Sequence, residues 1–318
     1  PRTVLLLGGR FLSAEACAAA QRIAAKTGAL ALIETFPARV RREAAAAELK
    51  RLPYLSEMAA ATLANVDTVI LAGAAYPVAF FALPGRPTRL APEQARVFEL
   101  SPPGARSDEA LNAIAEMIKA DAAPPRSAPA SMKPAESGAI DAVALAQCVA
   151  ASLPAEAIVC DESNTSGLFC YDAAAAAPAH DWLTLTGGAI GQGLPLATGA
   201  AIACPERRVI ALEADGSALY TIQSLWTQAR EALNVTNVIL NNGAYAILRL
   251  EMMRAGVNQL SDAANGLFDL TNPAIDFCAI ARGFGVPAER VTTPGELSAA
   301  LNRSYSTPGP ALIEVVIR

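Results

Sequence analysis

The chain has 318 residues, of which 53% are hydrophobic and 17% are charged, and its formal net charge is −5. This length suggests about two domains, and the negative charge argues against a general nucleic-acid binder, which would carry a basic surface. No apolar stretch approaches the roughly 20 residues that cross a bilayer, so we expect neither a nucleic-acid nor a membrane partner.

The first segment, residues 1–120, alternates predicted strands and helices, which is typical of a parallel α/β domain. Strands are expected at 3–7, 30–33 and 68–72, and helices at 14–27, 55–64 and 108–119. The turn Gly8-Gly9-Arg10 resembles part of a nucleotide-binding loop but lacks the full GxGxxG pattern. We therefore predict a Rossmann-like domain that binds no nucleotide.

Residues 121–137 are rich in Pro, Ala and Ser and are predicted to be a linker. The second segment, 138–318, repeats the alternation, with near-continuous apolar strands that indicate a sheet covered on both faces. Strands are expected at 157–160, 182–185, 209–213, 235–240 and 311–317, and helices at 193–203, 221–232 and 274–282. The predicted fold is α/β, with two doubly wound parallel-sheet domains.

The six cysteines are scattered, and none forms a CxxC pair that would indicate structural zinc or a redox motif. We interpret them as reduced core thiols of a cytoplasmic protein.

Polar side chains follow two of the predicted strands of the second segment. Asp215 comes after the apolar run 209–212, and Asn242 comes after the run 238–240. A predicted amphipathic helix lies between them, with Leu219, Ile222, Leu225, Trp226 and Ala229 at three- and four-residue spacings. Ligands bind at the carboxyl ends of strands in doubly wound sheets, so the two side chains should converge on one point. Their oxygens suit Mg²⁺.

The start of that helix, near Gly216 and Ser217, would offer free backbone N–H groups to an anion. Gly216 would let a phosphate approach the main chain closely. The pattern therefore fits a magnesium diphosphate. An ordinary strand-to-helix turn with an aspartate cap fits these residues equally well.

The surrounding sequence resembles the C-terminal half of thiamine-diphosphate enzymes of the acetolactate synthase and benzoylformate decarboxylase group. That family carries Gly-Asp-Gly, then some two dozen or more residues, then Asn-Asn. This chain has Ala214-Asp215-Gly216 and Asn241-Asn242, and two further segments look like the family's, 187–195 (GGAIGQGLP) and 161–165 (DESNT). The likeness covers the second segment fully and the first, as the family's central domain, more loosely.

The resemblance implies a ligand set for thiamine diphosphate and Mg²⁺. Asp215, Asn242 and the carbonyl of Ala244 would bind the metal. Gly188 and Ile190 would lie against the cofactor's rings, with Ile190 bending it. The diphosphate would be held by Gly216, Ser217, Tyr245, Ala246, Asn164 and Thr165. Some relatives hold FAD in the central domain, but the Gly8-Gly9 turn does not favour it here.

The resemblance also implies the activity and the partners. The expected function is an acetolactate synthase-like 2-oxo-acid decarboxylase or carboligase, acting as a homodimer or homotetramer on a small 2-oxo acid. The family's catalytic glutamate sits in an N-terminal pyrimidine-binding domain, and no segment here corresponds to it. We expect the chain to be a fragment of a longer enzyme, although a separate polypeptide could supply that domain. The catalytic residue is thus unknown.

Two residues of the stretch after Asn242 are candidates for the substrate pocket. Leu248 replaces the glutamate of pyruvate decarboxylases, and Glu251 lies near a tryptophan of acetolactate synthases; Glu251 could equally be a solvated helix residue. The single histidine, His180, is expected at the surface. Two alternative functions stay open, a benzoylformate-type decarboxylase and a non-catalytic subunit that keeps the fold.

Overall fold

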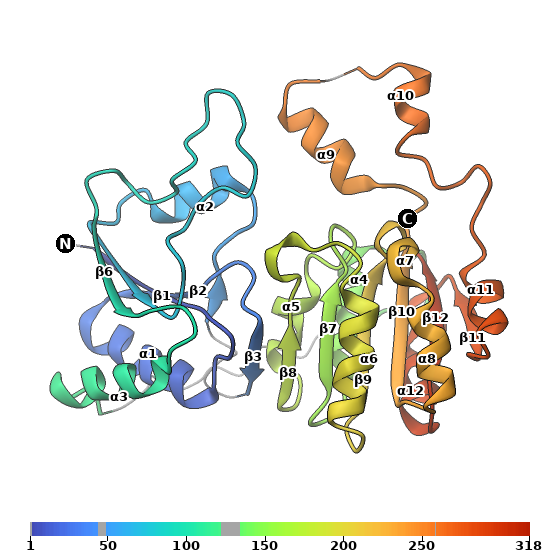
Figure 1. Cartoon of the computed structure of the whole chain (residues 1–318), viewed down its shortest axis with the longest axis horizontal. Helices are drawn as coiled ribbons and strands as arrows, with labels where there is room; N and C mark the ends of the chain where they lie inside the picture. Colours follow the sequence, from blue (N-terminus) through green and yellow to red (C-terminus); the bar gives the residue numbers. More distant parts are fainter. Residues whose placement is uncertain (1, 44–48, 122–133, 258) are drawn as a thin grey trace. The chain divides into compact units, whose positions relative to one another are not determined.

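The structure is a computed structural model that describes residues 2–43, 49–121, 134–257 and 259–318. The chain divides into a first unit, Pro1–Ala128, and a second unit, Pro129–Arg318, which Figure 1 shows with their helices and strands labelled. Most of the predicted linker, 122–133, lies outside the described residues. No helix in the described part of the chain is long and apolar enough to cross a membrane.

The first unit is built on a parallel sheet with the strand order β4-β2-β1-β5-β6. This is the order of a Rossmann sheet. Its helices are α1 (Ala14–Thr27), α2 (Ser56–Leu63) and α3 (Ser107–Met117). Its strands are β1 (Thr3–Leu7), β2 (Leu30–Ile33), β3 (Arg39–Arg42), β4 (Lys50–Arg51), β5 (Thr68–Ala72) and β6 (Arg96–Ser101).

Apolar side chains cover both faces of this first sheet. Leu5 and Leu7 of β1 pack with α1 and α3 on one face, while Val4 and Leu6 pack with α2 on the other. The alternation follows from the strand's two-residue period. The prediction missed β6, whose Val97 and Phe98 are exposed at the edge of the sheet.

The strands of the second unit run in the order β11-β12-β10-β9-β7-β8, and all their pairings are parallel. These strands are β7 (Ile158–Glu162), β8 (His180–Leu183), β9 (Val209–Ala214), β10 (Val235–Asn241), β11 (Ala288–Val291) and β12 (Ala311–Val316). The first strand of the unit, β7, lies between β8 on one side and β9 on the other, and the later strands β10, β12 and β11 extend the sheet beyond β9. The predicted α/β class with doubly wound parallel sheets is confirmed.

Helices cover both faces of the second sheet as well. On one face α4 and α12 pack against Val238 and Leu240, and on the other α6, α8 and α11 pack around Ile239; α6 and α8 lie in front of the strands in Figure 1. The helices are α4 (Ala142–Ser152), α5 (Cys170–Ala173), α6 (Gly193–Ala203), α7 (Asp215–Thr221), α8 (Ser224–Arg230), α9 (Ala246–Arg254), α10 (Asp262–Gly266), α11 (Phe277–Gly283) and α12 (Pro294–Ser306), with short 3-10 helices η2 (Ala174–Ala176) and η3 (Thr186–Gly188).

The helix predicted at 221–232 is observed as α8, which is shorter and spans Ser224–Arg230. The predicted apolar stripe from Leu219 to Ala229 does not lie on one helix, because α7 ends at Thr221 and Ile222 and Gln223 separate it from α8. Leu225 is fully buried, but Leu219 and Trp226 of the predicted apolar stripe are exposed. α7 starts at Asp215, directly at the strand end and close to the start near Gly216 and Ser217 that the sequence predicts.

The prediction that His180 lies at the surface is also wrong, because this residue is buried. It begins β8, its Nδ1 lies 2.7 Å from the carbonyl oxygen of Pro178, and its ring packs edge-on against Trp182. An ordered strand start accounts for this histidine without a catalytic role.

Candidate active site

The two strand ends that carry Asp215 and Asn242 meet at the carboxyl edge of the second sheet. β9 and β10 are parallel neighbours, with Ala214 opposite Leu240. The carboxylate of Asp215 accepts hydrogen bonds from the backbone N–H groups of Asn242, at 3.0 Å, and Gly243, at 2.8 Å. The two strand ends therefore lie side by side, and Figure 1 shows α7 and α9 at this end of the sheet.

Asp215 is a buried carboxyl group whose only bonding partners among the described residues are main-chain donors. Its side chain is 1% exposed, and the other carboxylate oxygen accepts from the N–H of Gly216 at 2.8 Å. Burial raises the pKa of Asp215, and the hydrogen bonds from Gly216, Gly243 and Asn242 only partly offset that rise. Neutral donors do not cancel a charge, so a nearby cation would stabilise this carboxylate.

The side-chain amide of Asn242 bonds to the β7 turn and to its own turn. Its Nδ2 donates to Ser166 Oγ at 3.1 Å, and its Oδ1 accepts from the N–H of Ala244 at 2.9 Å. The carbonyl of Ala244 accepts from the N–H of Ala246 at 2.9 Å. Each of these oxygens has two lone pairs, so each can still bind a cation. The donor set, one carboxylate and two neutral oxygens, fits Mg²⁺.

The turn after β7 joins the same edge. Asn164 has φ 48°, a left-handed conformation that asparagine tolerates, and its Nδ2 donates to Ser217 Oγ at 3.0 Å. Thr165 follows on this turn and is half-buried. The hydrogen bonds of Asn164 and of Ser166 thus tie the β7 turn to both α7 and Asn242. The loops after three adjacent strands meet here.

Gly188 and Ile190 lie on an exposed turn that Glu162 supports from below. Gly187, Gly188 and Gly191 all have positive φ, so side chains would be strained at these positions. The carboxylate of Glu162 accepts from the N–H groups of Gly191 and Gly193, both at 2.6 Å. Ile190 is 44% exposed. The bonds of Glu162 explain how an exposed glycine turn can hold Ile190 in place.

Gly216 and Tyr245 are also together, but in a way that the sequence did not predict. A Cβ atom on Gly216 would collide with the ring of Tyr245. The N–H of Tyr245 donates to the carbonyl of Phe268 at 2.9 Å, and Ala246 begins α9. The space left by the missing side chain of Gly216 is therefore used by the tyrosine ring, on that side of the main chain.

The two substrate-pocket candidates lie on α9, which has no buried residues. Leu248 is exposed. Glu251 is not the solvated helix residue considered above, because its side chain is 19% exposed and Arg254 binds both carboxylate oxygens, at 2.7 and 2.8 Å. This pair leaves Glu251 less available to a substrate than the sequence suggested.

Glu162 and Glu213 were not identified as candidates from the sequence. Both are buried close to the site, Glu162 at the end of β7 and Glu213 in β9, two residues before Asp215. Glu213, the penultimate residue of β9, is fully buried, and neither of its carboxylate oxygens has a hydrogen-bond partner among the described residues. A Cβ atom on Gly193 would collide with it. The one available signal was an acidic residue inside an otherwise apolar strand.

Glu213→Leu should raise the free energy of unfolding by about 1–3 kcal/mol at pH 7, because it removes an unpaired buried carboxyl group. Burial, and then the charges of Glu162 and Asp161, raise the pKa of Glu213 well above its ordinary value of 4.5. Below the pKa that Glu213 has in the unfolded chain, this group does not lower the free energy of unfolding through ionisation. As the pH rises from there toward the higher pKa of the folded state, the free energy of unfolding of the wild type falls. Denaturant unfolding from pH 5 to 8 should show a fall in wild type that the variant lacks. An equal fall in both would contradict this assignment.

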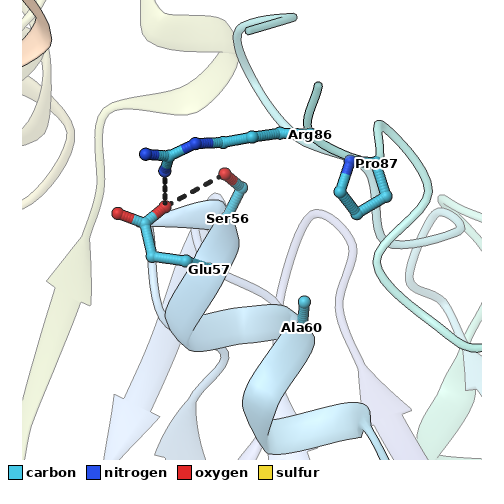
Figure 2. A pocket seen from close by; sticks show the side chains of 5 residues that line it. All are labelled: Ser56, Glu57, Ala60, Arg86 and Pro87. Carbon is cyan, nitrogen blue, oxygen red and sulfur yellow. Dashed lines mark hydrogen bonds and ion pairs between the residues drawn. The ribbon is translucent and has the colours of Figure 1, made fainter. Parts of the chain in front are cut away.

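Two surface hollows lie away from this site. One, of about 250 Å³, is lined by Ser56, Glu57, Ala60, Arg86 and Pro87; Figure 2 shows that an ion pair of 2.9 Å between Arg86 and Glu57 lies along it. The other, of about 610 Å³, lies between α4 and α12 and includes Cys148 and Glu296. Neither contains a residue of the candidate site. Arg86, the cation that lines the first hollow, is already paired with Glu57, so we assign no ligand to this hollow.

Comparison with known proteins shows which family this sequence is similar to. Residues 167–315 match the thiamine pyrophosphate enzyme family's C-terminal TPP-binding domain. IlvX of Mycobacterium tuberculosis, a candidate acetolactate synthase large subunit by its name, is 49% identical over 99% of this chain. Residues 167–315 belong to this family of TPP-binding domains. Benzoylformate decarboxylase of Pseudomonas aeruginosa is 35% identical over 64% of this chain and 38% of its own length.

A solved structure of a thiamine diphosphate-dependent enzyme is similar to the whole chain. The thiamine diphosphate-dependent 4-hydroxybenzoylformate decarboxylase of Rhodococcus jostii superposes on all of this chain with a TM-score of 0.79 and 28% sequence identity. The chain spans 61% of the length of that structure and 61% of IlvX. The family resemblance inferred from the motifs is confirmed.

Proposed function

We propose that this chain is part of a thiamine-diphosphate- and Mg²⁺-dependent 2-oxo-acid decarboxylase or carboligase, similar to acetolactate synthase. The observation that carries the proposal is the meeting of the Asp215 carboxylate and the Asn242 turn at the ends of β9 and β10. The TPP-binding domain match supports it. When bound, thiamine diphosphate supplies the nucleophilic carbon that adds to a 2-oxo acid and accepts the electrons released with CO₂.

The residues of this chain would bind and orient the cofactor. Asp215, Asn242 and the Ala244 carbonyl would bind Mg²⁺, because they offer oxygen ligands at one edge of the sheet. The diphosphate contacts would come from the β7 turn, the start of α7 and the start of α9, through Asn164, Thr165, Gly216, Ser217, Tyr245 and Ala246. Gly188 and Ile190, on the turn that Glu162 supports, would hold the rings.

The activity requires a pyrimidine-binding domain, supplied in cis or in trans, because the family's catalytic glutamate lies there. We propose a homodimer or homotetramer in which that domain meets this site. The six cysteines are free thiols, five of them buried, which favours the reducing cytoplasm as the compartment.

Substrate assays on the full-length protein containing this chain, with Mg²⁺ and thiamine diphosphate, test the activity. The proposal predicts that pyruvate yields acetolactate. Conversion of an aromatic 2-oxo acid to its aldehyde, without acetolactate, would instead support the benzoylformate-type alternative, which the 35% identity to the Pseudomonas enzyme favours. If neither substrate reacts and calorimetry detects no cofactor binding, the non-catalytic alternative replaces the proposal.

We further propose that the first unit holds no flavin, because its glycine turn is occupied by the chain itself. The N–H of Gly9 donates to the carboxylate of Glu34 at 2.7 Å, where a Rossmann domain would place a phosphate. Across the strand ends, a Cβ atom on Gly73 would lie 2.7 Å from the carbonyl oxygen of Gly8. The Glu34 carboxylate therefore competes with a phosphate for the N–H of Gly9, and the close approach of Gly8 leaves no room for a side chain at position 73.

Purified full-length protein should therefore show no flavin absorbance and should give no heat when FAD or ADP is added. Denaturation and fluorescence of the released fraction provide a second check for tightly held flavin. One equivalent of flavin per chain would disprove this proposal, and it would leave the thiamine-diphosphate site unaffected.

A further inference from the structure

Asn241, the first of the two asparagines, holds the turn that carries the candidate metal ligands. Its Oδ1 accepts from the N–H of Gly243 at 3.0 Å. The same N–H also points to the carboxylate of Asp215 at 2.8 Å. The turn from 241 to 244 is therefore fixed from two sides, by Asp215 and by Asn241.

The amide of Asn241 is itself held by Glu314 of the neighbouring strand β12. Asn241 Nδ2 donates to Glu314 Oε1 at 2.8 Å, and Glu314 is 1% exposed. β12 runs parallel to β10, with Glu314 opposite Ile239. Because Glu314 sits inside a regular strand pairing, its carboxylate is held on a rigid element.

Arg290 of β11 anchors this buried carboxylate from the far side. Its Nε lies 3.0 Å from Glu314 Oε2, and its Nη2 lies 3.5 Å from Asp276. A chain of polar contacts thus runs from Arg290 through Glu314 and Asn241 to Gly243. Removing one partner of such a buried network leaves the others unpaired.

We propose that Glu314 is a positioning residue for the metal-binding turn, acting through Asn241; this inference rests on the proposed function of that turn. Glu314 touches neither Asp215 nor Asn242 through any hydrogen bond found in the described residues. It fixes the orientation of the Asn241 amide and thereby the Gly243 N–H. Groups that orient metal ligands in this way contribute about 10- to 100-fold to metal affinity.

A separate metal site at Glu314 is the main competing interpretation. Ligand atoms of Asp276, Cys278 and Glu314 lie within 4.8 Å of one another. However, the guanidinium of Arg290 already pairs with both carboxylates. Asp276 also caps α11 by accepting from the N–H of Ala279 at 2.9 Å. The guanidinium of Arg290 therefore already neutralises the two carboxylates that a metal ion would bind.

Glu314→Gln in the full-length protein tests the proposal. A glutamine keeps the shape but removes the charge that Arg290 and Asn241 share. The matched control is Glu289→Gln, which removes a carboxylate of β11 that pairs with Arg303 at the surface. Asn241→Ala serves as a second variant that breaks the same contact chain at another point and leaves the buried carboxylate intact.

Two measurements are needed. Amide hydrogen exchange at Gly243, followed by NMR without metal, reports the positioning itself; titration of Mn²⁺ in the presence of thiamine diphosphate reports its effect on metal affinity. We expect faster Gly243 exchange and a 10- to 100-fold weaker Mn²⁺ affinity in Glu314→Gln and Asn241→Ala, with less than twofold change in Glu289→Gln.

The Gly243 exchange rate and the Mn²⁺ affinity together decide whether Glu314 positions the metal-binding turn. Unchanged Gly243 exchange in both variants would overturn the positioning role. Faster exchange with unchanged Mn²⁺ affinity would also overturn it, because the turn would then move without consequence for the metal. If wild type binds no Mn²⁺ at all, the proposed metal site fails, and the positioning role for metal falls with it even where Gly243 exchange responds.

Discussion

Asp215→Asn should weaken the binding of thiamine diphosphate in the presence of Mg²⁺ by at least about 100-fold, which corresponds to about 2.7 kcal/mol. Asp215 is the only charged ligand proposed for the metal, and its carboxylate is 1% exposed among main-chain donors. The amide keeps the size of the side chain but removes the charge that would attract the cation. Asp215→Ala should abolish Mg²⁺-dependent retention of the cofactor.

Calorimetric titration of the cofactor into the full-length protein, with excess Mg²⁺, measures this effect. Asp262→Asn is the matched control, because Asp262 is an exposed aspartate at the start of α10, and it should bind as wild type does. Circular dichroism at the assay temperature verifies that the variants are folded. Wild-type affinity in a folded Asp215→Asn protein would show that the metal assignment is wrong.

Arg207→Ala should lower the free energy of unfolding of the second unit by about 3–5 kcal/mol, because it removes a guanidinium that pairs with a buried carboxylate and bonds two strand carbonyls. Arg207 Nη2 lies 2.6 Å from the carboxylate of Asp181, which is 1% exposed. The same guanidinium donates to the carbonyls of Glu156, at 2.6 Å, and Ala157, at 3.1 Å. It therefore holds the entries of β7 and β8 together.

Thermal and urea unfolding of the variant measure the loss. Arg230→Ala is the control, because its ion pair with Glu231 is exposed, and such pairs contribute about 0–1 kcal/mol. A loss below about 1 kcal/mol in Arg207→Ala would mean that the Asp181 pair is no more important than a surface pair.

The sequence predicts the edge of the sheet where the candidate site lies because strand ends have local signals. A buried apolar run that stops at Asp215 or Asn242 is visible without knowing the fold, and parallel neighbours bring such ends together. The capping box of α12, formed by Thr293 and Glu296, is an equally local signal that the prediction overlooked.

Other features depend on contacts between distant residues, so no local pattern reveals them. The break between α7 and α8 lies inside a regular apolar spacing. The ring of Tyr245 fills the space beside Gly216, and Glu162 supports the Gly191 turn from 29 residues away. His180 was expected at the surface because it lies in a predicted loop before a strand, but it is the first residue of the buried strand β8.

A crystal structure of the full-length protein with Mg²⁺ and thiamine diphosphate would show whether Asp215 binds the metal. We expect a cation bound between the Asp215 carboxylate, the Asn242 side-chain oxygen and the Ala244 carbonyl, with the diphosphate against the start of α7. A cofactor bound elsewhere, or a cation that does not touch Asp215, would contradict this expectation.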